Sequence, residues 1–259
     1  MSSDSIPMLS PEGLALPPGV HAVQTTRAGG VSEGPWASLN LATHTGDAPE
    51  RVAENRRRLQ QALGLARPVA WPRQVHGGQV VSAEALAAQP ADSVEADAVM
   101  ATAPGEVCAV QTADCLPVVL VADSGDAVAA VHAGWRGLAG GILEATVASL
   151  QAARPAAGLM AWMGAAIGPE AFEVGPEVRA AFLDGDAGAA SAFRPGRDGR
   201  YLADIYALAR RRLERAGVAQ VAGGGRCTLA EDEVFYSYRR DGTTGRMATL
   251  VWIDGDAAG

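Results

Sequence analysis

Three short segments each place a side chain that can bind a metal at or near the end of an apolar run. Their sequences are RQVHG, TADCLP and VHAGWR, which contribute His76, Cys115 and His132. The three residues are separated by 39 and then 17 positions, too far for a zinc finger but suitable for neighbouring strands that converge on one cleft. Two imidazoles and one thiolate would leave a fourth coordination position open, as in catalytic zinc sites. The spacing also fits a buried Cys115 thiol and a core His132 without any metal.

Two arginines flank this set, at a place where an anion site is expected. Arg73 lies three residues before the first histidine, and Arg136 lies four residues after the second. A guanidinium binds phosphate through two parallel hydrogen bonds, and Arg136 also stands where a helix is expected to begin. The alternative is a surface ion pair with one of the 29 carboxylates.

Two further polar residues adjoin the expected ligands. Asp114 precedes Cys115, so on a strand its side chain would point to the opposite face and act behind the metal, orienting an imidazole or accepting a proton. Gln74 is two residues from His76 and would share its face on a regular strand, where it could contact substrate.

Composition excludes several classes of protein. The chain has 259 residues and a net charge of −8, the wrong sign for binding nucleic acid. No apolar run approaches the roughly 20 residues that a membrane span needs, and the first residues lack a signal-peptide pattern. Three cysteines are too few for a disulfide framework. We therefore expect a cytoplasmic protein that binds neither nucleic acid nor membranes.

The histidine count excludes one kind of oxidase. A multicopper oxidase needs many imidazoles for its trinuclear cluster and its blue copper site. The sequence contains only His21, His44, His76 and His132. Laccase chemistry is therefore not expected.

Apolar periodicity predicts strands and helices that interleave at uneven spacing. This pattern favours one layered α/β domain with a mixed sheet, spanning residues 1–259, with flexible ends at about 1–12 and 255–259. Helices are expected to begin near Asp47, after Gly134 and near Leu202. Strands are expected at 20–24, 68–71, 74–81, 97–102, 107–111, 118–122, 127–132, 160–167 and 247–253.

Several longer motifs resemble one known family. They are SLNLATHTGDAPERVAENRRRL, RQVHG, ADAVMAT, QTADCLPVVL, VHAGWRG, AAIGPEAFEVG and FYSYRRDGTTGRMA. Together, from about residue 20 to 253, they resemble the YfiH-type family, also called the polyphenol oxidase or multicopper laccase family and, more recently, a purine nucleoside phosphorylase family.

The resemblance implies a fold, a metal and an activity. The fold would be similar to the catalytic domain of the cytotoxic necrotizing factors, and Zn²⁺ would be held by His76, Cys115 and His132. The implied activity is phosphorolysis of adenosine, inosine, guanosine and methylthioadenosine, with phosphate as co-substrate, together with deamination of adenosine. The family places the loop containing Asn40 and His44 near the site, where either could contact ribose or base. An Asx turn and a solvated histidine are the alternatives.

Two other functions remain open at this point. Cys115 could act as a nucleophile with His132 or His76 as its base, which would suit an amide hydrolase that edits a peptidoglycan precursor, as some family members are described. A structural zinc module without enzymatic activity is the third possibility.

Overall fold

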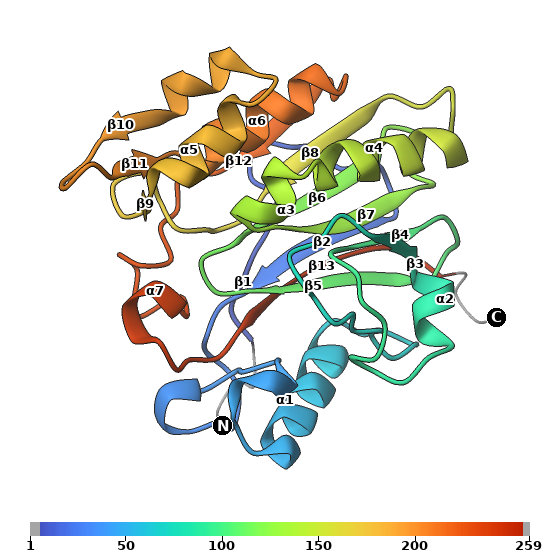
Figure 1. Ribbon diagram of the computed structural model, residues 1–259. Coiled ribbons are helices and arrows are strands. Elements are labelled where there is room, and N and C mark those ends of the chain that lie inside the picture. Colours follow the sequence, from blue (N-terminus) through green and yellow to red (C-terminus); the bar gives the residue numbers. More distant parts are fainter. Residues whose placement is uncertain (1–5, 256–259) are drawn as a thin grey trace.

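Two β-sheets stacked face to face form the centre of the molecule (Figure 1). The computed structural model describes residues 6–255. The larger sheet is mixed, with strand order β12-β8-β6-β7-β4-β3, and the smaller one is antiparallel, with order β1-β2-β13-β5. The six-stranded sheet comprises β3 (Val80–Ser82), β4 (Ala98–Ala101), β6 (Leu116–Ala122), β7 (Val128–Ala133), β8 (Leu159–Met163) and β12 (Gln220–Gly223). The four-stranded sheet comprises β1 (Met8–Leu9), β2 (Val20–Thr25), β5 (Val107–Thr112) and β13 (Met247–Ile253).

Helices cover the outer faces of this pair of sheets (Figure 1). Most of them lie over the six-stranded sheet, whereas α1 lies beneath the four-stranded sheet. The helices are α1 (Pro49–Ala62), α2 (Ala83–Ala87), α3 (Trp135–Ala139), α4 (Ile142–Ala153), α5 (Pro176–Leu183), α6 (Ile205–Arg215) and α7 (Tyr238–Asp241). Short 3₁₀ turns are η1 (Gly34–Trp36), η2 (Thr43–Thr45) and η3 (Ala187–Ala192), and a small antiparallel sheet comprises β9 (Glu173–Val174), β10 (Phe193–Pro195) and β11 (Tyr201–Ala203).

Alternating side chains on β6 explain why the layers stack. Leu116 and Leu120 pack towards the helices, and Val119 and Val121 pack against the four-stranded sheet. All four are fully buried, so this strand is apolar on both faces. Leu59 of α1 lies in a separate apolar cluster on the far side of the four-stranded sheet. The expected mixed α/β architecture is therefore confirmed.

Four expected elements differ from the structure. Residues 68–71 form no strand, and of 74–81 only the end is strand, as β3. The backbone N–H groups of 75–77 are directed to a carboxylate and cannot join a ladder. The expected strand at 160–167 ends at 163. The helix expected after Gly134 is divided into α3 and α4 by Gly140 and Gly141, and Gly141 has a left-handed φ of 90°.

The ends of the chain show one ordered feature. Met8–Leu9 pair with β2 as the edge strand β1. Residues 1–5 and 256–259, where flexible ends were also expected, lie outside the described residues. Within residues 6–255, every helix is too short or too polar to traverse a lipid bilayer.

Candidate functional site

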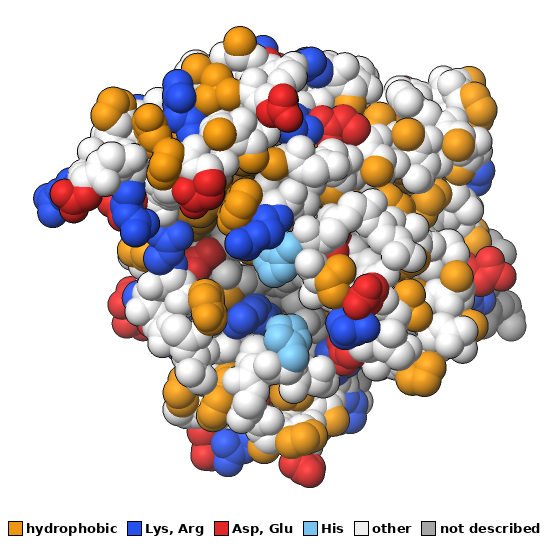
Figure 2. All heavy atoms as spheres, viewed as in Figure 1, with side chains coloured by type: hydrophobic (Ala, Val, Ile, Leu, Met, Phe, Trp, Pro, Cys, Tyr) orange, Lys and Arg blue, Asp and Glu red, His pale blue; other side chains and the backbone are white. Residues whose placement is uncertain are grey.

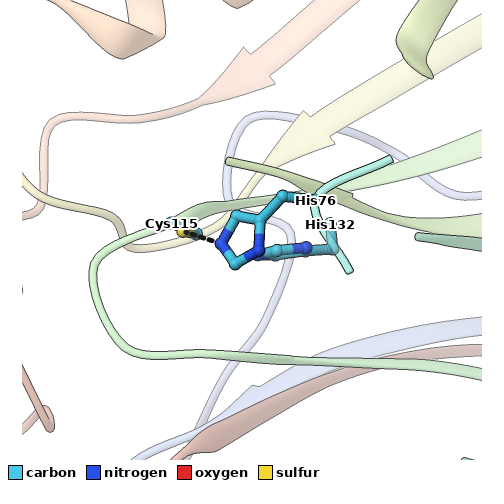
Figure 3. Close-up of side chains that lie close together, drawn as sticks. All are labelled: His76, Cys115 and His132. Carbon is cyan, nitrogen blue, oxygen red and sulfur yellow. Dashed lines mark hydrogen bonds between the residues drawn. The ribbon is translucent and has the colours of Figure 1, made fainter. Parts of the chain in front are cut away.

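The three predicted ligands meet where the chain passes from one sheet to the other. β5 belongs to the four-stranded sheet and β6 to the six-stranded sheet, and Cys115 is the last residue of the link between them. Pro117 of β6 pairs with His132 of β7, so His132 lies beside the start of β6. His76 comes from the loop that leads to β3. Figure 3 shows the two imidazoles and the thiol directed towards one another.

The geometry of this cluster suits one metal ion. The ligand atoms of His76, Cys115 and His132 all lie within 4.8 Å of one another, and His76 Nε2 is 3.8 Å from Cys115 Sγ. The imidazole rings meet edge to face, with centroids 4.8 Å apart. His132 is buried and Cys115 partly so, whereas His76 is exposed, so the cluster opens to solvent on the His76 side. The expectation that these three residues converge is confirmed.

Gly134 forms one wall of this cluster. A Cβ atom at this position would lie 2.9 Å from the His76 ring, 3.0 Å from Cys115 Sγ and 3.5 Å from His132 Nε2. Any larger residue would therefore displace the donor atoms. The close approach, together with a nitrogen and sulfur donor set that suits zinc, indicates that the residues present fit such an ion.

A buried carboxylate holds both imidazoles in place. Asp97 is fully buried, and its Oδ1 accepts hydrogen bonds from His132 Nδ1 at 2.8 Å and from the backbone N–H of His76 at 2.9 Å. Its Oδ2 accepts the N–H groups of Gly77 at 2.7 Å and Val75 at 3.3 Å. One side chain thus fixes the ring of one ligand and the backbone of the other.

This arrangement has two consequences for the ligands. The bond to Asp97 engages Nδ1 of His132, so Nε2 is the nitrogen available to a metal. His76 has a left-handed φ of 60°, a conformation that costs of order 1–3 kcal/mol for a residue other than glycine. The backbone hydrogen bonds to Asp97 offset that strain.

The sequence reasoning did not single out Asp97. It lies immediately before β4, in the ADAVMAT motif, with only buried neighbours on either side. Burial of an ionised carboxylate is unfavourable unless it is hydrogen-bonded or paired. A carboxylate at the start of an apolar strand, with an alanine on either side, was the available signal.

The thiol and the inner imidazole influence each other's charge. Burial acts to raise the pKa of Cys115, but the charge of His132 and hydrogen bonds from both histidines outweigh it and lower this pKa to about 6. Burial acts to lower the pKa of His132, whereas the charge of Cys115 and the hydrogen bond to Asp97 raise it to about 9. The metal-free cluster therefore favours a thiolate beside an imidazolium.

Two residues that were predicted to contact substrate bind other protein groups instead. Arg73 forms an ion pair with Glu95 at 2.8 Å, and about half of each side chain is exposed, so the surface alternative describes it better. Gln74 does not lie on a strand beside His76. Its amide binds the backbone of Gln111 twice, donating to the carbonyl at 2.8 Å and accepting the N–H at 2.7 Å. Neither head group is free for substrate.

Asn40 also has a structural role. It is fully buried, its Nδ2 donates to Ala42, Thr45 and Asp47, and its Oδ1 accepts the N–H groups of Ala42 and Arg246. These bonds use its hydrogen-bonding capacity, so Asn40 shapes the loop that carries the other candidate.

Two predicted side chains do remain accessible. His44 is exposed in η2, and partial burial together with the positive charge of Arg246 lowers the pKa of its imidazole, which keeps it neutral at pH 7. Arg136 is exposed on α3 and lies over the Trp135 ring at 4.4 Å, and no carboxylate of residues 6–255 pairs with it. Both could contact a ligand. Figure 2 shows a hollow on this face with histidine and arginine side chains around it.

Asp114 faces away from the imidazoles. Its Oδ1 accepts a hydrogen bond from Thr228 and its Oδ2 accepts the backbone N–H of Arg239, each at 2.6 Å. Like His76, it has a left-handed φ, here 88°. Asp114 therefore fastens α7 and the Thr228 loop beside Cys115, as expected for a residue behind the ligands, but it orients no imidazole.

Large exposed hydrophobic side chains adjoin the cluster. Among residues 6–255 they are Val75, 43% exposed, and Tyr238, 59% exposed. Val75 precedes His76, and Tyr238 precedes the residue whose N–H binds Asp114. These positions place apolar surface where a ligand at the cluster could contact it.

An apolar pocket lies elsewhere. It has a volume of about 390 Å³, is lined by Trp71, Leu86 and Val107 among others, and includes none of the three ligands. Its lining includes Arg67, Glu84 and Glu106 but no histidine or cysteine, so the cluster is the better candidate site.

Comparison with known proteins identifies the family. A family model described as "Multi-copper polyphenol oxidoreductase laccase" matches residues 21–254. The chain belongs to this family. The purine nucleoside phosphorylase YfiH of Shigella flexneri is 55% identical over 238 residues, which cover 92% of this chain and 96% of that protein. A purine nucleoside phosphorylase of Pseudomonas aeruginosa, PA4543, is 53% identical over 238 residues, with 92% and 95% covered.

A solved structure agrees with this assignment. The Neisseria meningitidis protein NMB0706 superposes with a TM-score of 0.89 at 49% identity, covering 96% of this chain and 99% of that one. The resemblance to the YfiH-type family is therefore confirmed. The similarity to the cytotoxic necrotizing factors stays a prediction.

The family's laccase description does not match the residues of this chain. Of its four histidines, only His76 and His132 adjoin Cys115. His21 pairs with Asp254 at 2.8 Å. Within residues 6–255, this family member thus has one cluster with three donors, which is too few for a trinuclear copper site.

Substitution of Gly134 tests the fit of the cluster in this family member. We expect Gly134→Ala to weaken zinc binding about tenfold or more, because the added methyl group overlaps the donor side chains. Gly78→Ala is the matched control, since a Cβ there meets nothing within 4 Å. Competition with a chromogenic chelator measures both affinities. Equal zinc affinity in the two variants would contradict the proposed geometry.

Substitution of Asp97 tests its hold on both imidazoles. In Asp97→Asn an amide group replaces an oxygen that accepts hydrogen bonds, so we expect zinc binding to weaken about 10- to 100-fold and the free energy of unfolding to fall by about 1–3 kcal/mol. Asp254→Asn is the control, because Asp254 pairs with His21 at the same 2.8 Å but on the surface. Chelator competition and urea denaturation report the two quantities. If both variants behave alike, Asp97 is not the organising residue.

Proposed function

We propose that this protein is a zinc-dependent purine nucleoside phosphorylase. The observation that carries the proposal is a cluster of two imidazoles and one thiol that is open on one side and has exposed apolar side chains next to it. Relatives that are more than 50% identical over nearly the whole chain are named purine nucleoside phosphorylases. Adenosine, inosine, guanosine and methylthioadenosine are the proposed nucleosides, phosphate is the co-substrate, and the cytoplasm is the proposed location.

Zinc would be held by His76, Cys115 and His132. When bound, it would supply Lewis acidity next to the substrate. Asp97 keeps Nδ1 of His132 engaged, so that the opposite nitrogen faces the cluster. Asp114 keeps the C-terminal loops closed around Cys115.

Residues around the cluster offer contacts for the purine base and for the ribose of a nucleoside. Tyr238 and Val75 present apolar surface to a purine ring, which binds readily to aromatic faces. His44 remains neutral near pH 7 and can donate or accept a hydrogen bond to ribose or base. Arg136 is the exposed cation on the α3 side of the cluster. We include deamination of adenosine in the proposal as a second reaction of the same site.

A second candidate is favoured by the charge state of the metal-free cluster. The lowered pKa of Cys115 beside His132 is typical of a cysteine nucleophile with an imidazole partner. That arrangement would suit an amide hydrolase acting on a peptidoglycan precursor. The phosphorylase proposal ranks first because the relatives carry that name and because the donor set suits zinc.

Product analysis distinguishes these functions. Metal-quantified protein is incubated with inosine or adenosine, with and without phosphate, and the products are separated by chromatography. We expect free base and ribose 1-phosphate only when phosphate is present. Cys115→Ala should lose turnover about 100-fold or more, because it removes a ligand of the catalytic metal.

Two controls make the outcome decisive. Cys227→Ala, which leaves the cluster intact, should keep its turnover, and circular dichroism should report folded protein for both cysteine variants. Full phosphorolysis by Cys115→Ala would contradict the proposal. Amide hydrolysis by metal-free protein, without nucleoside turnover, would support the second candidate instead.

A further inference from the structure

Arg246 lies beside the cluster although it is far from it in sequence. It immediately precedes β13, whose first residue, Met247, pairs with Thr112 at the end of β5. From Thr112 the chain continues through Ala113 and Asp114 to Cys115. The sheet register therefore brings Arg246 to the edge from which the ligand loop departs.

The backbone of Arg246 is held firmly. Its N–H donates to Oδ1 of the buried Asn40 at 3.0 Å, and its carbonyl accepts the N–H of Leu41 at 3.3 Å. The loop predicted to contact substrate through Asn40 thus positions an arginine.

The guanidinium of Arg246 has one edge without a protein partner. Nη1 donates to the carbonyls of Thr244 and Gly245 at 3.0 and 2.9 Å, and the head group lies 5.7 Å from the centre of the Tyr238 ring. Nε and Nη2 donate to no residue of 6–255. These two nitrogens form the fork that binds carboxylates and phosphates through parallel bonds.

The guanidinium of Arg246 has no carboxylate partner among residues 6–255. No acidic side chain of residues 6–255 forms an ion pair with Arg246, in a chain with 29 carboxylates and 21 arginines. Burial lowers the pKa of Arg246, and the negative charges of Cys115 and Asp114 oppose this effect. A partly buried guanidinium with two unpaired N–H donors favours an anion that enters from solvent.

We propose that Arg246 binds the phosphate co-substrate through Nε and Nη2, next to the His76, Cys115 and His132 cluster. The inference rests on the proposed phosphorylase function, for which it names the phosphate-binding residue. Of the two arginines near the ligands in sequence, Arg73 is already paired with Glu95, and Arg136 lies over the Trp135 ring. Arg246 places the anion beside Tyr238, where the proposed base would lie.

Steady-state kinetics test this assignment. In Arg246→Met we expect the KM for phosphate to rise at least about tenfold, because both parallel bonds are lost, with little change in the KM for inosine. Arg246→Lys keeps the charge but not the fork and should give an intermediate increase. The control is Arg194→Met, at an exposed pair with Glu170.

A chemical probe tests the same site without turnover. In metal-free protein at pH 8, alkylation of Cys115 is followed with iodoacetate, which is anionic, and with iodoacetamide, which is neutral. We expect inorganic phosphate to protect wild-type Cys115 and to protect Arg246→Met at least about tenfold less well. The ratio of iodoacetate to iodoacetamide rates should also fall in Arg246→Met and not in Arg194→Met.

The two experiments separate the inference from the function on which it rests. Wild-type protein that shows no phosphorolysis but is protected by phosphate through Arg246 would contradict the phosphorylase and support the anion site. Active protein in which Arg246→Met leaves the KM for phosphate and the protection unchanged would overturn the inference alone. Circular dichroism of both Arg246 variants verifies that the comparison is between folded proteins.

Discussion

The site depends on the need of one buried carboxylate for hydrogen-bond donors. An ionised Asp97 inside the protein is tolerated only when its oxygens are satisfied, and they accept four hydrogen bonds. Three come from the backbone of the loop that carries His76, and the fourth comes from the ring of His132. The same requirement therefore bends a loop into a left-handed conformation and turns an imidazole towards Cys115. The arrangement of the candidate ligands thus follows from the hydrogen bonds that the buried Asp97 carboxylate must accept.

The stacked sheets explain why the donors meet at this edge. The chain leaves one sheet at Thr112 and enters the other at Leu116, so Cys115 lies at the junction of two layers. The register of β6 with β7 brings His132 alongside, and that of β13 with β5 brings Arg246. The candidate metal ligand His132 and the proposed anion-binding residue Arg246 are thus placed by different sheets around a shared loop. Both sheets are held together by apolar side chains that take no part in the chemistry.

The sequence predicted what depends on local pattern. Apolar alternation located β5, β6, β7 and β13 to within a few residues, and the metal-capable residues at their ends predicted the cluster. The prediction of a strand over 74–81 was wrong. The pattern of apolar residues does not show that the backbone N–H groups of residues 75–77 donate to the Asp97 carboxylate, so these groups cannot hydrogen-bond to a neighbouring strand. Asn40 and Arg246 are 206 residues apart, so no local signal could show that one positions the other. Gln74 and Arg73 have side chains that can bind a substrate. In the folded protein, however, Gln74 hydrogen-bonds Gln111 and Arg73 pairs with Glu95, and the sequence pattern does not reveal these partners.

The most direct measurement is the anomalous X-ray scattering of crystals of the zinc-loaded protein. The account predicts one strong peak at the zinc edge, about 2.0–2.1 Å from a nitrogen of each of His76 and His132 and about 2.3 Å from Cys115 Sγ, with no side chain in the fourth position. A zinc ion bound by other residues, or a fourth protein ligand that closes the site, would contradict it.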